Sequence, residues 1–122
     1  MDKPHLAGRR ILVVEDDFIL AAALCAQIED YGGVVVGPAP TLEKGCLLLQ
    51  AEPLPDGCIF DIRLGEQMVY PLADSVMRSG VPLIFASNES RASIPETYAA
   101  IPLMAKPVSM TCLVKRLISL SP

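Results

Sequence analysis

Ionisable and polar side chains follow four of the five short apolar runs in the sequence, each at the point where its run ends. They comprise carboxylates, a hydroxyl and an amine, which are groups that bind cations and contact phosphate. These residues are Glu15, Asp16 and Asp17 after the first run, Asp61 after the third, Ser87 and Asn88 after the fourth, and Lys106 after the fifth.

Brought together, Asp16, Asp61, Ser87 and Lys106 would supply the parts that phosphoryl transfer needs and little else. Clustered carboxylates repel one another unless a cation joins them, and a set of oxygen ligands suits Mg²⁺. A carboxylate can also act as a nucleophile and form an acyl phosphate. A lysine and a hydroxyl can then contact the phosphoryl oxygens and neutralise their charge. The residue types therefore indicate phosphate chemistry assisted by a divalent cation.

The apolar runs that precede these residues are predicted to be strands of a parallel sheet. Each run is continuously apolar, which is typical of strands that are covered on both faces. The runs are Ile11–Val14, Val34–Val36, Cys58–Phe60, Val81–Ala86 and a weaker one, Pro102–Ala105.

Helical patterns separate the predicted strands. In the first of them, Leu20, Leu24 and Ile28 recur on one helix face. Asp17 precedes this helix and is expected to cap it rather than to bind a cation. The helices are expected over 18–31, from the cap Thr41 to about Glu52, over 70–79, and from the cap Ser109 to about Leu120, the last with Leu113, Leu117 and Leu120 facing inward.

The alternation of strands and helices predicts an α/β fold, with a flavodoxin-like, doubly wound, five-stranded parallel sheet in the order 2-1-3-4-5. The segment 88–101 interrupts the pattern, because it contains Pro95 and few large apolar residues. We expect a short or irregular fourth helix there. In this topology ligands bind beyond the carboxyl ends of the strands, between strands one and three. The polar residues that follow the strands fall at that edge.

Length and composition restrict the class of protein. The 122 residues suit a single domain over 1–122, with a core over about 10–120. No apolar stretch approaches the roughly 20 residues of a membrane span, and no signal peptide is visible. The net charge of −4 argues against a nucleic-acid partner. The four cysteines lack the spacing of zinc ligands and are expected to be reduced and mostly buried in a cytoplasmic protein.

Four segments make the sequence resemble a response-regulator receiver domain of two-component signalling, and the resemblance covers about 10–120. The short segment 88–101 also resembles the receivers that alphaproteobacteria use with stress-sensing and light-sensing kinases, in which the fourth helix is reduced. The four segments are ILVVEDD (11–17), FDIRL (60–64), LIFAS (83–87) and AKP (105–107).

The resemblance implies a role for individual residues. Asp61 would be the phosphoacceptor, which receives a phosphoryl group from a histidine kinase or a histidine phosphotransfer protein. Ser87 and Lys106 would contact that group. The domain would be no enzyme beyond its own Mg²⁺-dependent phosphorylation and dephosphorylation, and no membrane partner is implied. The Mg²⁺ ligands would be Glu15, Asp16, Asp61 and the backbone carbonyl of Arg63.

Some positions need separate treatment within this resemblance. Leu103 stands where the family often has a Tyr or Phe that reports the switch, and Tyr98 is a candidate to replace it. Arg63 and Glu89 lie two residues beyond the phosphoacceptor and the hydroxyl residue, where the family tunes the lifetime of the phosphoryl group. Arg63 could screen that group or pair with Glu89. The bond between Lys106 and its following proline is expected to be cis, as is usual in the family.

Three functions are open from the sequence. The leading one is a phosphoacceptor domain that switches protein–protein contacts. The alternative is a receiver-like binding module that acts without phosphorylation, which Leu103 and the short segment 88–101 motivate. The third is a Mg²⁺ phosphatase of the haloacid-dehalogenase type. That class has the pattern Asp-x-Asp after its first strand, whereas this sequence has Glu15, Asp16 and Asp17 there.

Overall fold

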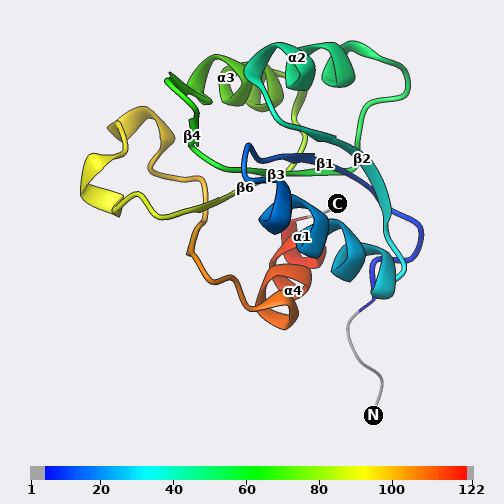
Figure 1. The fold of residues 1–122 in the computed structure, drawn as a ribbon. Coiled ribbons are helices and arrows are strands. Elements are labelled where there is room, and N and C mark those ends of the chain that lie inside the picture. The colour runs from blue at the N-terminus through cyan, green and yellow to red at the C-terminus, as the bar shows by residue number, and fades with distance from the viewer. Residues whose placement is uncertain (1–4, 121–122) are drawn as a thin grey trace.

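The computed structural model describes residues 5–120 as three layers, with a parallel sheet between two pairs of helices (Figure 1). The five expected strands correspond, in chain order, to β1, β2, β3, β6 and β7, and they lie in the predicted order 2-1-3-4-5. The predicted doubly wound fold is therefore confirmed. Across the sheet the strands are β2 (Val34–Ala39), β1 (Arg10–Val14), β3 (Gly57–Phe60), β6 (Leu83–Ser87) and β7 (Leu103–Ala105).

Successive side chains of the central strands alternate between two apolar cores. Phe60 pairs in register with Phe85, and both belong to the core on one face of the sheet. Their neighbours Ile59 and Ile84 also pair and belong to the core on the other face. All four are at most 1% exposed. Burying each such side chain stabilises the fold by roughly 1.5–3 kcal/mol, so the centre of the sheet is a rigid base for the residues at its edge.

Two helices cover each face of the sheet (Figure 1). The helices are α2 (Leu42–Gln50) and α3 (Tyr70–Ser79) on one face, and α1 (Phe18–Asp30) and α4 (Met110–Leu120) on the other. Helices α2 and α3 pack on the core that contains Phe60, and helices α1 and α4 pack on the core that contains Ile59. Among the described residues, no helix is both long and apolar enough to cross a bilayer.

The predicted helix caps are confirmed. Asp17 Oδ1 accepts hydrogen bonds from the first amides of α1, and Thr41 Oγ1 accepts one from the amide of Lys44. Helix α3 ends at Ser79 and is capped by Gly80, whose φ of 73° is a conformation that glycine adopts readily. Ser109 Oγ lies 3.4 Å from the amide nitrogen of Cys112 at the start of α4.

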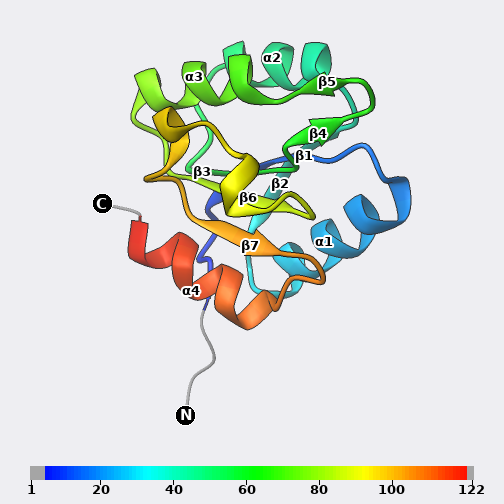
Figure 2. The ribbon, with the colours of Figure 1, turned by 90° about the vertical axis from the view of Figure 1, so that its left-hand side faces the viewer.

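The segment between β6 and β7 contains two short 3₁₀ helices instead of an α-helix (Figure 2). They are η1 (Arg91–Ser93) and η2 (Glu96–Tyr98), which confirms the expected reduction of the fourth helix. The guanidinium of Arg91 donates to the carbonyl of Ile101 over 2.8 Å and so ties the two ends of the segment together.

A small hairpin after β3 was not predicted. Its strands are β4 (Arg63–Leu64) and β5 (Gln67–Met68), which pair antiparallel around a turn at Gly65 and Glu66. Gly65 has φ 62°, as a tight two-residue turn of this kind requires of its first residue.

Some details of the sequence predictions are wrong. Strand β6 begins at Leu83 instead of Val81, and α2 ends at Gln50 instead of Glu52. Leu120 is 38% exposed instead of inward-facing. Leu20, on the helix face that also carries Leu24 and Ile28, is 43% exposed and borders a cavity at the carboxyl edge of the sheet. The expectation of mostly buried cysteines is also wrong: they are Cys58 (buried), Cys25 and Cys46 (intermediate) and Cys112 (exposed).

Candidate functional site

The polar residues that follow the strands lie together in one cavity of about 380 Å³ at the carboxyl edge of the sheet. Parallel strands direct their carboxyl ends to the same edge, so β1, β3, β6 and β7 each deliver a residue to it. The predicted residues that line this cavity are Glu15, Asp16, Asp61, Arg63, Ser87 and Lys106.

Lys106 joins two of the carboxylates. Its Nζ donates to Glu15 Oε1 over 2.6 Å and to Asp61 Oδ2 over 2.9 Å. The three side chains are only 13%, 5% and 11% exposed respectively, so water screens these ion pairs weakly. The Lys106–Pro107 bond is cis, as expected. The structure thus places an amine between the predicted phosphoacceptor and a predicted metal ligand.

Burial and charge perturb the ionisation of this pair. Burial raises the pKa of Glu15 to about 7, although the bonds from Lys106 and from the Asp17 amide act in the opposite direction. Burial would lower the pKa of Lys106, but the bonds to Glu15 and Asp61 outweigh it and the pKa of the amine is raised. Lys106 therefore stays charged at neutral pH, and the cavity keeps a fixed positive charge beside Asp61.

Three carboxylates offer oxygens to a cation. One oxygen from each of Glu15, Asp16 and Asp61 lies within 4.8 Å of the others. The donor set contains oxygen alone, which suits Mg²⁺. Asp16 is exposed, and its Oδ2 accepts a hydrogen bond of 2.8 Å from the backbone amide of Gly65. The residues present therefore fit a small divalent cation that keeps part of its water shell.

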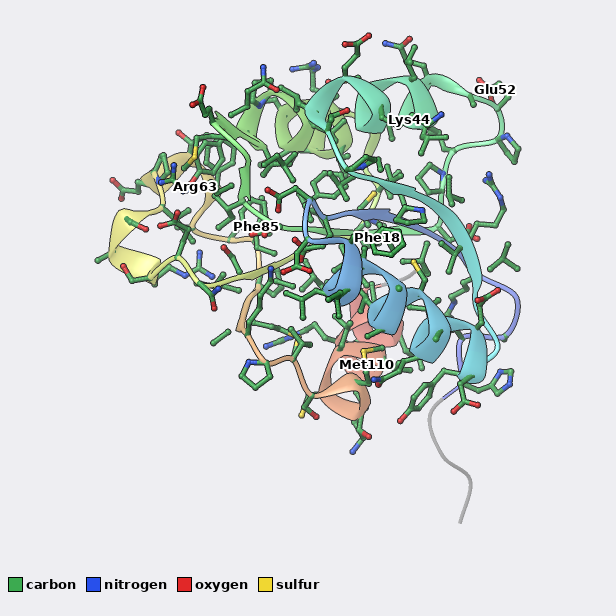
Figure 3. All side chains as sticks on the ribbon, viewed as in Figure 1. Phe18, Lys44, Glu52, Arg63, Phe85 and Met110 are labelled. Atoms are coloured by element: carbon green, nitrogen blue, oxygen red, sulfur yellow. The ribbon has the colours of Figure 1, made fainter. Side chains whose placement is uncertain are left out.

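Ser87 and two charged residues form the side of the cavity near β6. Ser87 is 1% exposed, and its Oγ accepts a hydrogen bond from the amide of Glu89. Arg63 Nε donates to Glu89 Oε1 over 3.1 Å, so Arg63 forms the pair with Glu89 that the sequence left open. Figure 3 shows Arg63 on the hairpin side, toward the segment that follows β6. The ion pair thus joins two walls of the cavity.

Aromatic residues lie behind this wall. Tyr70 stacks on Tyr98, with ring centroids 4.6 Å apart, and meets Phe85 edge to face at 6.3 Å. Leu103 is half-buried and packs against the same core. Tyr98 is therefore a packed residue on the segment between β6 and β7, and Phe85 connects that cluster to the strand that carries Ser87.

The structure brings together every predicted site residue around one cavity. Metal ligation by the backbone carbonyl of Arg63 stays a prediction. Sequence reasoning missed Gly65, whose contribution is a backbone amide and therefore leaves little trace in residue type. A signal was present, because a glycine between Leu64 and Met68 is compatible with a tight hairpin turn.

Comparisons with known proteins show which proteins share this fold. No protein-family model matches the sequence, and no curated protein matches it. The response regulator PhyR from Brucella abortus aligns at 25% identity with a TM-score of 0.74, over 97% of this chain and 49% of that one. This chain thus spans about half the length of PhyR. SdrG from Sphingomonas melonis Fr1 aligns at 27% identity with a TM-score of 0.80, over 93% of this chain and 97% of SdrG.

A CheY-like response regulator receiver domain protein from Methanospirillum hungatei JF-1 has a similar fold. It aligns at 23% identity with a TM-score of 0.79, over 92% of both chains. The chain therefore has the fold of a response-regulator receiver domain, and this fold indicates a signalling domain of that general kind.

Proposed function

We propose that this receiver-fold domain accepts a phosphoryl group on Asp61, with Mg²⁺, from a histidine kinase or a histidine phosphotransfer protein, and thereby switches its contacts with a partner protein. The observation that carries the proposal is the position of Lys106, whose amine contacts both Glu15 and Asp61 in the cavity that Ser87 also lines. This combination supplies a nucleophile, a fixed positive charge and a hydroxyl donor at one point.

The chemistry assigned to Asp61 is a phosphoryl transfer. One of its carboxylate oxygens forms a bond to phosphorus as the phosphorus–nitrogen bond of a phosphohistidine breaks, and the imidazole leaves. The amine of Lys106 lies 2.9 Å from Asp61 Oδ2 and can donate to the phosphoryl oxygens once they are attached to Asp61. The hydroxyl of Ser87 can donate to the same oxygens, because its own oxygen already accepts from Glu89.

A magnesium ion would be held by Glu15, Asp16, Asp61 and the expected backbone carbonyl of Arg63. When bound, it would neutralise charge on the phosphoryl oxygens and lower the barrier to transfer. This assignment is supported by the three oxygens that lie within 4.8 Å of one another.

We expect no turnover of an external substrate. Water would hydrolyse the acyl phosphate and return Asp61 to its carboxylate, so that the only catalysis is self-phosphorylation and self-dephosphorylation. The expected cytoplasmic location and the absence of nucleic-acid and membrane partners stay predictions. The switch itself would be a shift between two conformations, one of which binds the phosphoryl group better.

Intact mass after incubation with acetyl phosphate tests this function. We expect a single phosphoryl adduct in the wild type with Mg²⁺, and none after removal of Mg²⁺ or in Asp61→Asn. Asp56→Asn is the matched control, because Asp56 precedes β3 whereas Asp61 follows the same strand. An adduct that survives in Asp61→Asn would contradict the assignment of the phosphoacceptor.

A binding module that acts without phosphorylation is the second candidate. It is favoured by Leu103 at the position of the usual switch aromatic and by the replacement of the fourth helix with η1 and η2. Failure of both acetyl phosphate and a phosphorylated histidine kinase to modify the wild type would make this account the better one. The phosphatase alternative requires hydrolysis of a small phosphate ester with turnover, which the same preparations can test.

A further inference from the structure

The β4–β5 hairpin reaches the acidic cluster through its turn. The two strands pair Arg63 with Met68 and Leu64 with Gln67. Gly65 has a positive φ of 62°. This fits a turn with glycine at its first central position, a conformation that costs other residues more. The hairpin presents the backbone amide of Gly65 to a carboxylate 49 residues earlier in the chain.

The base of this hairpin is fixed in the core. Leu64 is 5% exposed, and Met68 packs against the same core. The amide of Val69 donates to the carbonyl of Ile62 over 2.7 Å and closes the base of the hairpin. The turn can therefore hold its amide at a defined place, which a free loop could not do.

The three carboxylates of the cluster are held by different donors. Glu15 and Asp61 both accept from the amine of Lys106, whereas Asp16 accepts from the neutral amide of Gly65 over 2.8 Å. A backbone amide orients a carboxylate without adding a positive charge. It occupies one oxygen of Asp16 and leaves the other available, because a carboxylate accepts several hydrogen bonds or ligand bonds.

We infer that the amide of Gly65 is a positioning group for Mg²⁺ binding: it fixes the exposed carboxylate of Asp16 in the orientation that a cation shared with Glu15 and Asp61 requires. The inference rests on the proposed function, because it assumes that the cluster binds Mg²⁺. Without the amide, the Asp16 side chain would be mobile before binding and would lose conformational freedom when the cation binds, and this cost would appear as weaker binding.

The same hairpin carries a second connection. The guanidinium of Arg63, at the start of β4, pairs with Glu89 on the loop after β6. The hairpin therefore connects Asp16, through the Gly65 amide, to the side of the cavity that contains Ser87, through the pair of Arg63 with Glu89. Coupling of this kind is reciprocal, so a cation that benefits from the Gly65 bond must also strengthen that bond.

Mg²⁺ titrations of the wild type, Gly65→Pro and Gly65→Ala test the inference. Proline removes the amide hydrogen, whereas alanine keeps it. A Cβ at this position meets no atom within 4 Å, but the φ of 62° strains alanine, and proline, whose ring holds φ at about −65°, cannot adopt it. We expect the dissociation constant for Mg²⁺ to rise about five- to tenfold in Gly65→Pro, as the loss of one hydrogen bond implies, and less than about threefold in Gly65→Ala. The Mg²⁺ concentration for half-maximal modification by acetyl phosphate should rise with it, while the rate at saturating Mg²⁺ should hardly change.

Because Gly65→Pro changes the turn as well as removing the amide hydrogen, a measurement on the unaltered backbone of the wild type is also needed. Amide hydrogen exchange of Gly65 in the wild type should slow about fivefold or more at saturating Mg²⁺, and this protection should disappear in Asp16→Ala. The positioning role would be overturned if a folded Gly65→Pro bound Mg²⁺ as tightly as the wild type, or if the exchange rate of the Gly65 amide did not change with Mg²⁺. Either result would leave the proposed function intact. A wild type that binds no Mg²⁺ would overturn both.

Discussion

Tyr98 donates its phenolic hydrogen to Asp74 Oδ1 over 2.8 Å and thereby joins the second 3₁₀ helix to α3. Tyr98 is 8% exposed, and its ring stacks on Tyr70 of the same helix α3. The segment that stands in place of a fourth helix is therefore fastened to the neighbouring helix by a buried polar contact and an aromatic contact. Two variants test the polar contact from its two sides.

Loss of the hydroxyl should cost less than loss of its acceptor. Tyr98→Phe removes one hydrogen bond and keeps the ring, so we expect the free energy of unfolding to fall by about 1 kcal/mol. Asp74→Ala leaves a buried phenol without its partner, for which about 1–3 kcal/mol is expected. Urea denaturation of both variants measures the difference. A larger loss in Tyr98→Phe than in Asp74→Ala would contradict the assignment of donor and acceptor.

The same contact predicts a pH dependence. Burial, followed by the hydrogen bond to Asp74, raises the pKa of Tyr98 to about 12, whereas an unfolded tyrosine titrates near 10. The folded state holds the proton more tightly, so this stabilisation is complete below pH 10 and is lost as the pH rises through 12. Between pH 9 and 11, the wild type should lose about 1 kcal/mol more than Tyr98→Phe. An equal loss of unfolding free energy between pH 9 and 11 in the wild type and Tyr98→Phe, measured by urea denaturation, would contradict this.

The strands and helix caps could be predicted because their signals are local. The run Cys58–Phe60 is continuously apolar, and Thr41 and Asp17 are good capping residues directly before helices. Strand order then followed from the regular alternation, and the order placed Asp61 and Lys106 at the same edge. Glu15, Asp16, Asp61 and Lys106 were found because each lies directly after a strand, and Ser87 because it ends one. Arg63 was found only through the family resemblance.

The contacts that complete the site depend on tertiary structure and could not be predicted in this way. Arg63 and Glu89 are 26 residues apart, and the sequence left two roles for Arg63 open. Gly65 acts through its backbone, so residue type says little about its contact with Asp16. The bond from Tyr98 to Asp74 connects two elements whose relative position depends on packing.

Asp17 should affect stability much more than cation binding. Its Oδ1 caps α1 by accepting from the amides of Ile19 and Leu20. Asp17→Ala should lower the free energy of unfolding by about 1 kcal/mol, and Asp17→Ser should restore most of it. Thermal unfolding measures the cap, and calorimetric titration with Mg²⁺ shows whether affinity stays within about threefold. A tenfold loss of affinity in both variants would make Asp17 a ligand instead.

The ion pair of Arg63 and Glu89 should lengthen the life of the acyl phosphate, if Asp61 is phosphorylated as proposed. The pair joins two walls of the cavity, and its loss would admit water more readily. The Arg63 side chain is 58% exposed, so the pair is worth at most about 1 kcal/mol, or roughly a fivefold change in hydrolysis rate. Loss of the adduct over time, followed by mass, should be faster in Arg63→Ala and Glu89→Ala. Arg78→Ala on α3 is the control, and equal rates in all variants would exclude this role.

Lys106 should compete with Mg²⁺ for the same carboxylates. Its amine contacts Glu15 and Asp61, which are two of the three proposed acidic ligands. Lys106→Ala leaves a buried carboxylate without its partner, so stability without Mg²⁺ should fall by about 1–3 kcal/mol at neutral pH. Added Mg²⁺ should then raise the melting temperature more in Lys106→Ala than in the wild type, because the ion replaces the missing charge. Lys115→Ala on the exposed side of α4 controls for loss of a positive charge alone. A smaller Mg²⁺ response in Lys106→Ala than in the wild type would mean that the amine assists cation binding instead of opposing it.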